Sequence, residues 1–187
     1  ALKVQEEKED KLRSLIYQTL LVESASVKDL LTVIEANGIS SDINEISLES
    51  NKAQVFIQKG DKLQIIKQSE FERDFKLNQN GNKLEIEFDE KINYDFLGIL
   101  NEPTIIVTIV IPSDKNIDVN LKLINGKIGI SDVDINKGDI YLASGDIAIK
   151  DANVNELKIY TDTGTINSNS SIYKKVNIEV VRGKYAS

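Results

Sequence analysis

The chain has 187 residues, 41% of them hydrophobic, which suits one domain with a core, with or without a small appendage. Its formal net charge of −7 excludes a broad basic surface for nucleic acid or an anionic membrane. There is no cysteine and no histidine, which excludes disulfides, thiol catalysis, histidine-based triads and the commonest zinc ligand.

No apolar run in the sequence is long enough to span a bilayer. The longest apolar runs, of which residues 104–112 (TIIVTIVIP) are an example, have about half of the roughly 20 residues that a membrane helix needs. The chain begins at Ala1 and contains no methionine. We therefore expect a processed or truncated product whose signal peptide or membrane anchor has been removed.

Residues 1–40 have helical patterning. Leu12, Leu15 and Leu20 fall on one apolar stripe, and Ser26 is a suitable cap for a second helix that Gly38 would end. The sequence therefore predicts a short N-terminal helical segment over 1–40, a candidate cap for a β domain over 41–187.

From Ile43 onward the apolar period is two, which predicts strands. Gly60-Asp61 predicts a turn, and Asn80-Gly81 predicts a tight hairpin. We expect residues 107–111 to form the coil just below the repeats described next, and residues 46–57 to form a still earlier coil.

Four glycines recur at intervals of 19 residues, at positions 126, 145, 164 and 183. Aligned on them, the column five residues earlier is always aliphatic: Leu121, Ile140, Ile159 and Ile178. A fixed period near 20 with alternation inside it is typical of a solenoid, in which each coil buries its apolar side chains against its neighbours. The sequence therefore predicts an all-β fold, a single-stranded parallel β-helix with 19-residue coils.

The handedness and the glycine column have local reasons. Parallel crossovers are right-handed in most sheets, so we expect a right-handed helix. Gly126, Gly145, Gly164 and Gly183 lie where the chain bends, in a conformation that only glycine adopts cheaply. We expect Gly145→Val to destabilise its coil by more than about 1 kcal/mol.

The I-x-I-P pattern at 109–112 and the following x-L-x-S-G-D-I-x-I units resemble bacterial putative adhesin domains of unknown function, whose relatives include GIN head domains of autotransporter-like proteins. So does ISLESNKAQVFIQKGD at 46–61. The resemblance covers roughly residues 43–187 and implies a β-helical cell-envelope protein with an adhesive role. Its shared positions are turn glycines and core aliphatics, so it carries over no functional residue.

Outward columns near the glycines hold charged and aromatic residues that form a candidate glycan or partner surface. Aromatic rings beside charges can hold a sugar, although outward tyrosines also simply suit β geometry. The six candidate residues are Lys122, Asp139, Tyr141, Lys158, Tyr160 and Glu179.

We expect no catalytic residue, no metal and no cofactor. Asp132 and Asp151 share a column, but isolated carboxylates do not converge as a tight calcium site requires. The sequence contains neither G-x-x-x-x-G-K-[ST] nor a G-x-G-x-x-G followed by a helix, so we expect no phosphate-binding loop.

The leading interpretation is a non-enzymatic, extracytoplasmic or cell-surface protein, an adhesin or ligand-displaying scaffold with an unknown surface partner or glycan. One alternative is an intracellular scaffold that polymerises end to end through an uncapped last coil. A third is a carbohydrate-active enzyme acting through Asp139 or Lys158. The oligomeric state stays open.

Overall fold

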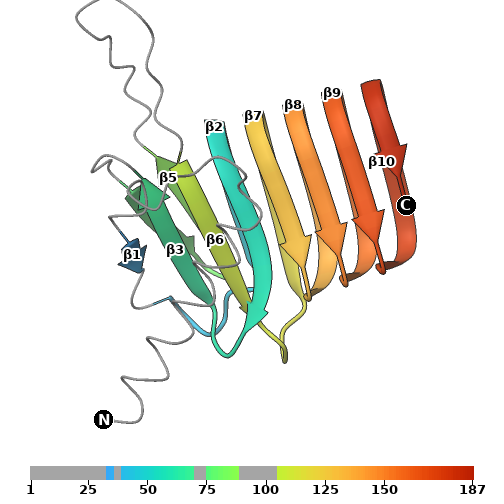
Figure 1. Ribbon diagram of the computed structural model, residues 1–187. Helices are drawn as coiled ribbons and strands as arrows, with labels where there is room; N and C mark the ends of the chain where they lie inside the picture. The colour runs from blue at the N-terminus through green and yellow to red at the C-terminus, as the bar shows by residue number, and fades with distance from the viewer. Residues whose placement is uncertain (1–32, 36–38, 70–74, 89–104) are drawn as a thin grey trace, which may run out of the picture.

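The computed structural model describes residues 33–35, 39–69, 75–88 and 105–187, and within these ranges the chain is an all-β solenoid without helices (Figure 1). The ten strands within these ranges form one sheet that winds from coil to coil. The strands are β1 (Val33–Glu35), β2 (Glu45–Gly60), β3 (Gln64–Ser69), β4 (Phe75–Asn80), β5 (Lys83–Phe88), β6 (Ile105–Pro112), β7 (Ile117–Ser131), β8 (Asp134–Lys150), β9 (Asn153–Asn169) and β10 (Ile172–Ala186).

The repeated part consists of β7 to β10, which lie side by side and pair in parallel (Figure 1). Equivalent residues are paired, so that Ile140 lies opposite Ile159 and Gly145 opposite Gly164, each 19 residues apart. β2 pairs with β7 in the same way, and Ala53 takes the place of the glycine. The solenoid that the repeat predicted is confirmed, while its handedness stays a prediction.

The core is a stack of aliphatic ladders inside the coils. The inward side chains of β8 are buried, among them Ile140, Leu142, Ile147 and Ile149. Each lies one strand spacing, about 4.8 Å, from its equivalent on the next coil. Burying such a side chain contributes about 1.5 to 3 kcal/mol, so neighbouring coils stabilise one another.

In the repeated part, the chain bends at two columns of residues that adopt positive φ. The first is the predicted glycine column, in which Gly126 has φ 154° and Gly145 has φ 143°. The second contains Asp132, Asp151 and Ser170, with φ of 46°, 51° and 51°. Aspartate tolerates this left-handed conformation better than most residues, so the column of Asp132 and Asp151 has a structural explanation as a turn.

The glycine column has a second cause that the sequence did not indicate. A Cβ at Gly145 would overlap the backbone carbonyl oxygen of Gly126 on the coil below, and a Cβ at Gly164 would overlap that of Gly145. The backbones of successive coils therefore approach too closely at this bend for any side chain.

The order of the first coils differs from the expected one. β2, rather than β6, lies directly against β7, and β6 lies beyond β2. β5 and β6 pair with the first and second halves of β2 respectively, and together they occupy the place of one coil. The expectation that residues 107–111 form the coil next to the repeats is wrong, because strands pair where their apolar faces are best covered and not according to their order in the chain.

Antiparallel strands end the ladder on the β6 side. β3 pairs antiparallel with β6, β1 with β3, and β4 with β5. The predicted hairpin is confirmed, since β4 and β5 meet at Asn80-Gly81, where Gly81 has φ 62°. The β6 end of the parallel ladder is thus covered by the antiparallel strands β3 and β1.

The N-terminal helical prediction is wrong for Val33–Glu35, which form β1 because they pair with β3. Residues 1–32 and 36–38 of that predicted segment lie outside the described residues. None of the residues that the structure describes belongs to a helix long and apolar enough to cross a membrane.

Candidate functional site

The six predicted surface residues lie together on the outward side of the first halves of β7 to β10. Strand pairing places Lys122, Tyr141, Tyr160 and Glu179 in consecutive positions along one column. Asp139 and Lys158 are paired in the adjacent outward column. We call this surface, made by Lys122, Asp139, Tyr141, Lys158, Tyr160 and Glu179, the tyrosine face.

Tyr141 and Tyr160 form a parallel stack at the centre of the tyrosine face. Their ring centroids are 5.5 Å apart and their planes differ by 4°. Stacking follows from the ladder, because equivalent residues on neighbouring parallel strands lie about one strand spacing apart. Aromatic pairs in such offset arrangements contribute about 0.5 to 1.5 kcal/mol beyond their buried area. The two rings therefore form a rigid aromatic surface.

Asp162 holds both tyrosines. The Tyr160 hydroxyl donates to Asp162 Oδ1 at 2.8 Å, and the Tyr141 hydroxyl donates more weakly to Oδ2 at 3.4 Å. The hydrogen bond to Asp162 is the main cause that raises the pKa of Tyr160, with burial and the negative charges of Asp162 and Glu179 adding to it. Tyr160 therefore stays a neutral donor over the whole physiological pH range.

We expect Asp162→Asn to lower the pKa of Tyr160 toward its ordinary value. The substitution removes the carboxylate that accepts the hydrogen bond of the Tyr160 hydroxyl and repels the phenolate, so the phenolate forms at lower pH. Tyrosine labelled with ¹³C at Cζ and titrated by NMR would report this pKa directly. Asp139→Asn removes a carboxylate from the same face without a bond to Tyr160, and should move the titration much less. Equal shifts in both variants would contradict the role of Asp162.

Lys122 is paired across the face with Glu49 of β2. Its Nζ lies 2.7 Å from Glu49 Oε1, and this hydrogen bond is the main cause that raises the pKa of Lys122. Because β2 and β8 lie on opposite sides of β7, the pair draws the ammonium away from Tyr141. Both side chains are more than half exposed, and such pairs contribute about 0 to 1 kcal/mol. The charge of Lys122 therefore remains available to a ligand at little cost.

Asp162 and Glu49 are the two residues of this surface that sequence reasoning missed. Asp162 follows Tyr160 by two positions on one strand, and the period of two places it on the same face. Glu49 was hidden because β2 has Ala53 at the glycine position, so the repeat could not be aligned on a glycine there. Aligning Ala53 with Gly126 places Glu49 beside Lys122.

The tyrosine face presents two aromatic rings, the carboxylates of Asp139 and Glu179, and the ammonium groups of Lys122 and Lys158. Asp139, Lys158 and Glu179 are exposed, while the tyrosines are half-buried. No group of three or more His, Cys, Asp or Glu side chains that could hold a metal occurs in the described part of the chain. The arrangement is suited to holding a polar ligand that also has apolar faces.

A family model described as Toastrack DUF4097 matches residues 43–185. No functionally curated protein matches the chain. Among solved structures it is similar to a putative cell adhesion protein from Clostridium sporogenes, at 11% identity and a TM-score of 0.50, covering 83% of this chain and 97% of the other. A putative adhesin from Bacteroides fragilis also matches, at 9% identity and a TM-score of 0.29, covering 86% and 99%.

The Clostridium protein supports the fold alone, since its sequence identity is low. The family match is stronger, because it extends from two residues before β2 nearly to the end of β10 and so includes every repeated coil. The chain therefore belongs to the Toastrack DUF4097 family.

Proposed function

We propose that this chain is a non-enzymatic, extracytoplasmic adhesin-like scaffold whose solenoid presents the tyrosine face to a glycan. The stack of Tyr141 and Tyr160, held by Asp162, is the observation that carries the proposal. The name of the Clostridium relative, a putative cell adhesion protein, supports the adhesive part. A right-handed single-stranded helix and a likeness to GIN head domains belong to the same proposal.

A glycan suits the tyrosine face for chemical reasons. Sugars combine apolar C–H faces with hydroxyl groups, so they bind best where an aromatic surface adjoins charged hydrogen-bonding groups. Asp139 and Lys158 supply an acceptor and a donor next to the rings. Because the tyrosine hydroxyls are already bonded to Asp162, the rings need not reorganise when a ligand arrives.

The location can be tested by protease shaving of intact producing cells, with mass spectrometry of the released peptides. We expect peptides from β7 to β10 to be released from intact cells. Release only after lysis would contradict the extracytoplasmic location and would favour the intracellular scaffold.

Ligand binding can be tested on a glycan array with the purified chain. We expect the double variant Tyr141→Ala and Tyr160→Ala to lose binding about tenfold or more, since aromatic stacking contributes about 1 kcal/mol for each ring. Tyr185→Ala is the matched control, because Tyr185 is an exposed tyrosine outside the tyrosine face. Equal losses in both variants would contradict the site. Turnover of a bound glycan that disappears in Asp139→Asn would instead support an enzyme.

A further inference from the structure

β10 differs from β7, β8 and β9 because the described strands cover only one of its two edges, and we call the other its open edge. Among the described strands β10 pairs with β9 and with no other. The residues of β10 that pair with buried core residues of β9 are themselves exposed. Val176 is 48% exposed and pairs with Leu157, which is 1% exposed; Tyr185 is 46% exposed and pairs with Ile166, which is 0% exposed. The N–H and C=O groups of β10 that point away from β9 have no partner strand in the described part of the chain, so with its apolar side chains this edge is a template for another strand.

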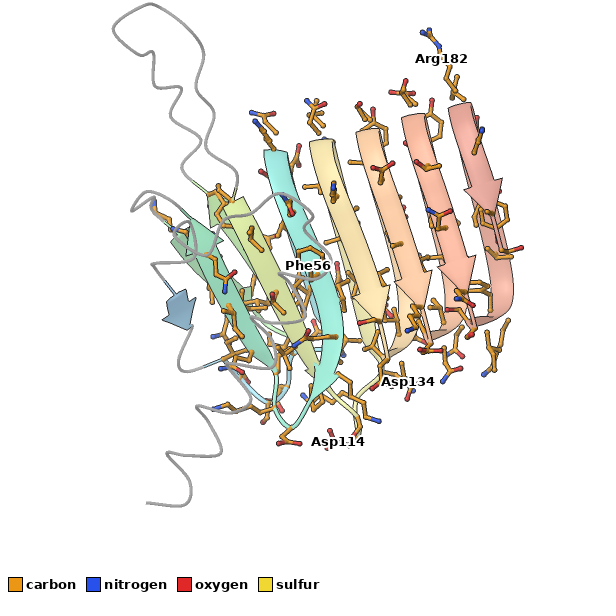
Figure 2. The ribbon with its side chains drawn as sticks, in the orientation of Figure 1. Phe56, Asp114, Asp134 and Arg182 are labelled. Carbon is orange, nitrogen blue, oxygen red and sulfur yellow. The ribbon has the colours of Figure 1, made fainter. Side chains whose placement is uncertain are left out.

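The charge of β10 is opposite to that of the whole chain. It contains Lys174, Lys175, Arg182 and Lys184 but only one acidic residue, Glu179, giving a formal +3 in a chain of net charge −7. Figure 2 shows Arg182 projecting away from the ladder at the bend of the terminal coil. A second β10 placed against this edge would bring like charges together.

The neighbouring coils indicate which charges suit the open edge. Along one outward column Lys137, Glu156 and Lys175 alternate in sign, and Lys175 Nζ lies 3.1 Å from Glu156 Oε1. The next position in this column, beyond Lys175, is therefore suited to a carboxylate. Arg182 and Lys184 flank the bend at Gly183 and favour acidic partners in the same way.

We propose that β10 binds an extended acidic segment of a partner protein, which adds to its open edge in parallel as the next coil. Apolar residues of the segment would cover Val176, Ile178 and Val180, and carboxylates would face Lys175, Arg182 and Lys184. A protein strand suits this edge better than a lipid surface, because hydrocarbon offers no partner for the free backbone groups. Of the tyrosine face only Glu179 lies on β10, and the contact does not involve the stacked Tyr141 and Tyr160, which lie on β8 and β9.

The test uses a labelled synthetic peptide with the sequence of residues 153–169 carrying Thr163→Glu and Thr165→Glu. If the peptide joins the open edge in the register that connects successive coils, as β8 with β9 and β9 with β10, Glu156 and the two new glutamates lie opposite Lys175, Arg182 and Lys184. We expect saturable binding to the purified chain, measured by fluorescence anisotropy, that weakens as salt rises. A peptide with N-methyl groups along its pairing edge should not bind, because it lacks the N–H donors.

Charge exchange provides the decisive control. The triple variant Lys175→Glu, Arg182→Glu and Lys184→Glu should bind the acidic peptide about tenfold more weakly, and should bind a peptide with lysines at the three facing positions. Lys59→Glu, Lys76→Glu and Lys127→Glu change the net charge equally on other strands, and should leave binding nearly unchanged. Circular dichroism verifies that each variant is folded.

Three results would overturn the proposal. One is equal binding of the acidic peptide by both triple variants. Another is concentration-dependent dimers or filaments that Val176→Lys abolishes, which would make a second copy of the chain the occupant. The third is binding to phosphatidylserine vesicles without binding to the peptide. None of these results depends on glycan binding at the tyrosine face, so the two proposals fail separately.

Discussion

Gly145→Ala is expected to lower the free energy of unfolding by at least about 2 kcal/mol, because two costs act together. The residue has φ 143°, where a side chain is strained by about 1 to 3 kcal/mol. The new Cβ would also overlap the carbonyl oxygen of Gly126 on the coil below. Relieving that overlap requires the paired strands β7 and β8 to separate, so the cost exceeds that of strain alone.

Gly81→Ala is the matched control for this prediction. Gly81 also has positive φ, at 62°, but a Cβ there would have open space around it. We expect this variant to lose only about 1 kcal/mol from backbone strain. Urea unfolding followed by circular dichroism would compare the two. Similar losses at both positions would show that close approach of the coils contributes nothing.

Ile147→Asp is expected to destabilise the chain by more than about 4 kcal/mol, enough to unfold many domains. Ile147 is fully buried between Ile128 and Ile166 in one of the aliphatic ladders. A carboxylate there would lose its water and gain no partner in the core. The neighbouring coils would be affected as well, because each covers one side of this position.

Ala148→Asp tests the same strand one residue further on. Ala148 is exposed on the outward side, so an added carboxylate stays in water and should change stability by less than about 0.5 kcal/mol. Urea midpoints of the two variants would therefore differ widely. A large loss for Ala148→Asp, or a small one for Ile147→Asp, would contradict the inward and outward assignment of β8.

The six predicted residues of the tyrosine face could be found from the sequence because all of them lie within the repeat. Once the glycines are aligned, each column of the sequence becomes a column of the structure, and Tyr141 beside Tyr160 follows directly. The aligned sequence does not show which rotamer each side chain adopts. The contact of Asp162 with both hydroxyls depends on rotamers that only the packed structure determines.

The first coils were predicted less well, since they lack the repeat. β5 and β6 share one coil although residues 89–104 separate them in the sequence. No local signal indicates that the second half of a coil has been displaced along the chain. The sequence of β3 alternates as that of any strand does. The turn at Gly60-Asp61 reverses the chain, but β3 is known to be antiparallel only once its partner β6 is known.

The sequence by itself determined the all-β class, the 19-residue period, the inward columns and the bends at glycine, because these depend on residues that are near in the chain or equivalent in the repeat. Only the tertiary structure decided that β2 lies against β7, that antiparallel strands end one side of the ladder, and that Asp162 and Glu49 complete the tyrosine face. The physical reason is that strand pairing joins backbones whatever their separation in sequence. Periodicity specifies which face of a strand is buried, but the choice of neighbour depends on how all the apolar faces are covered together.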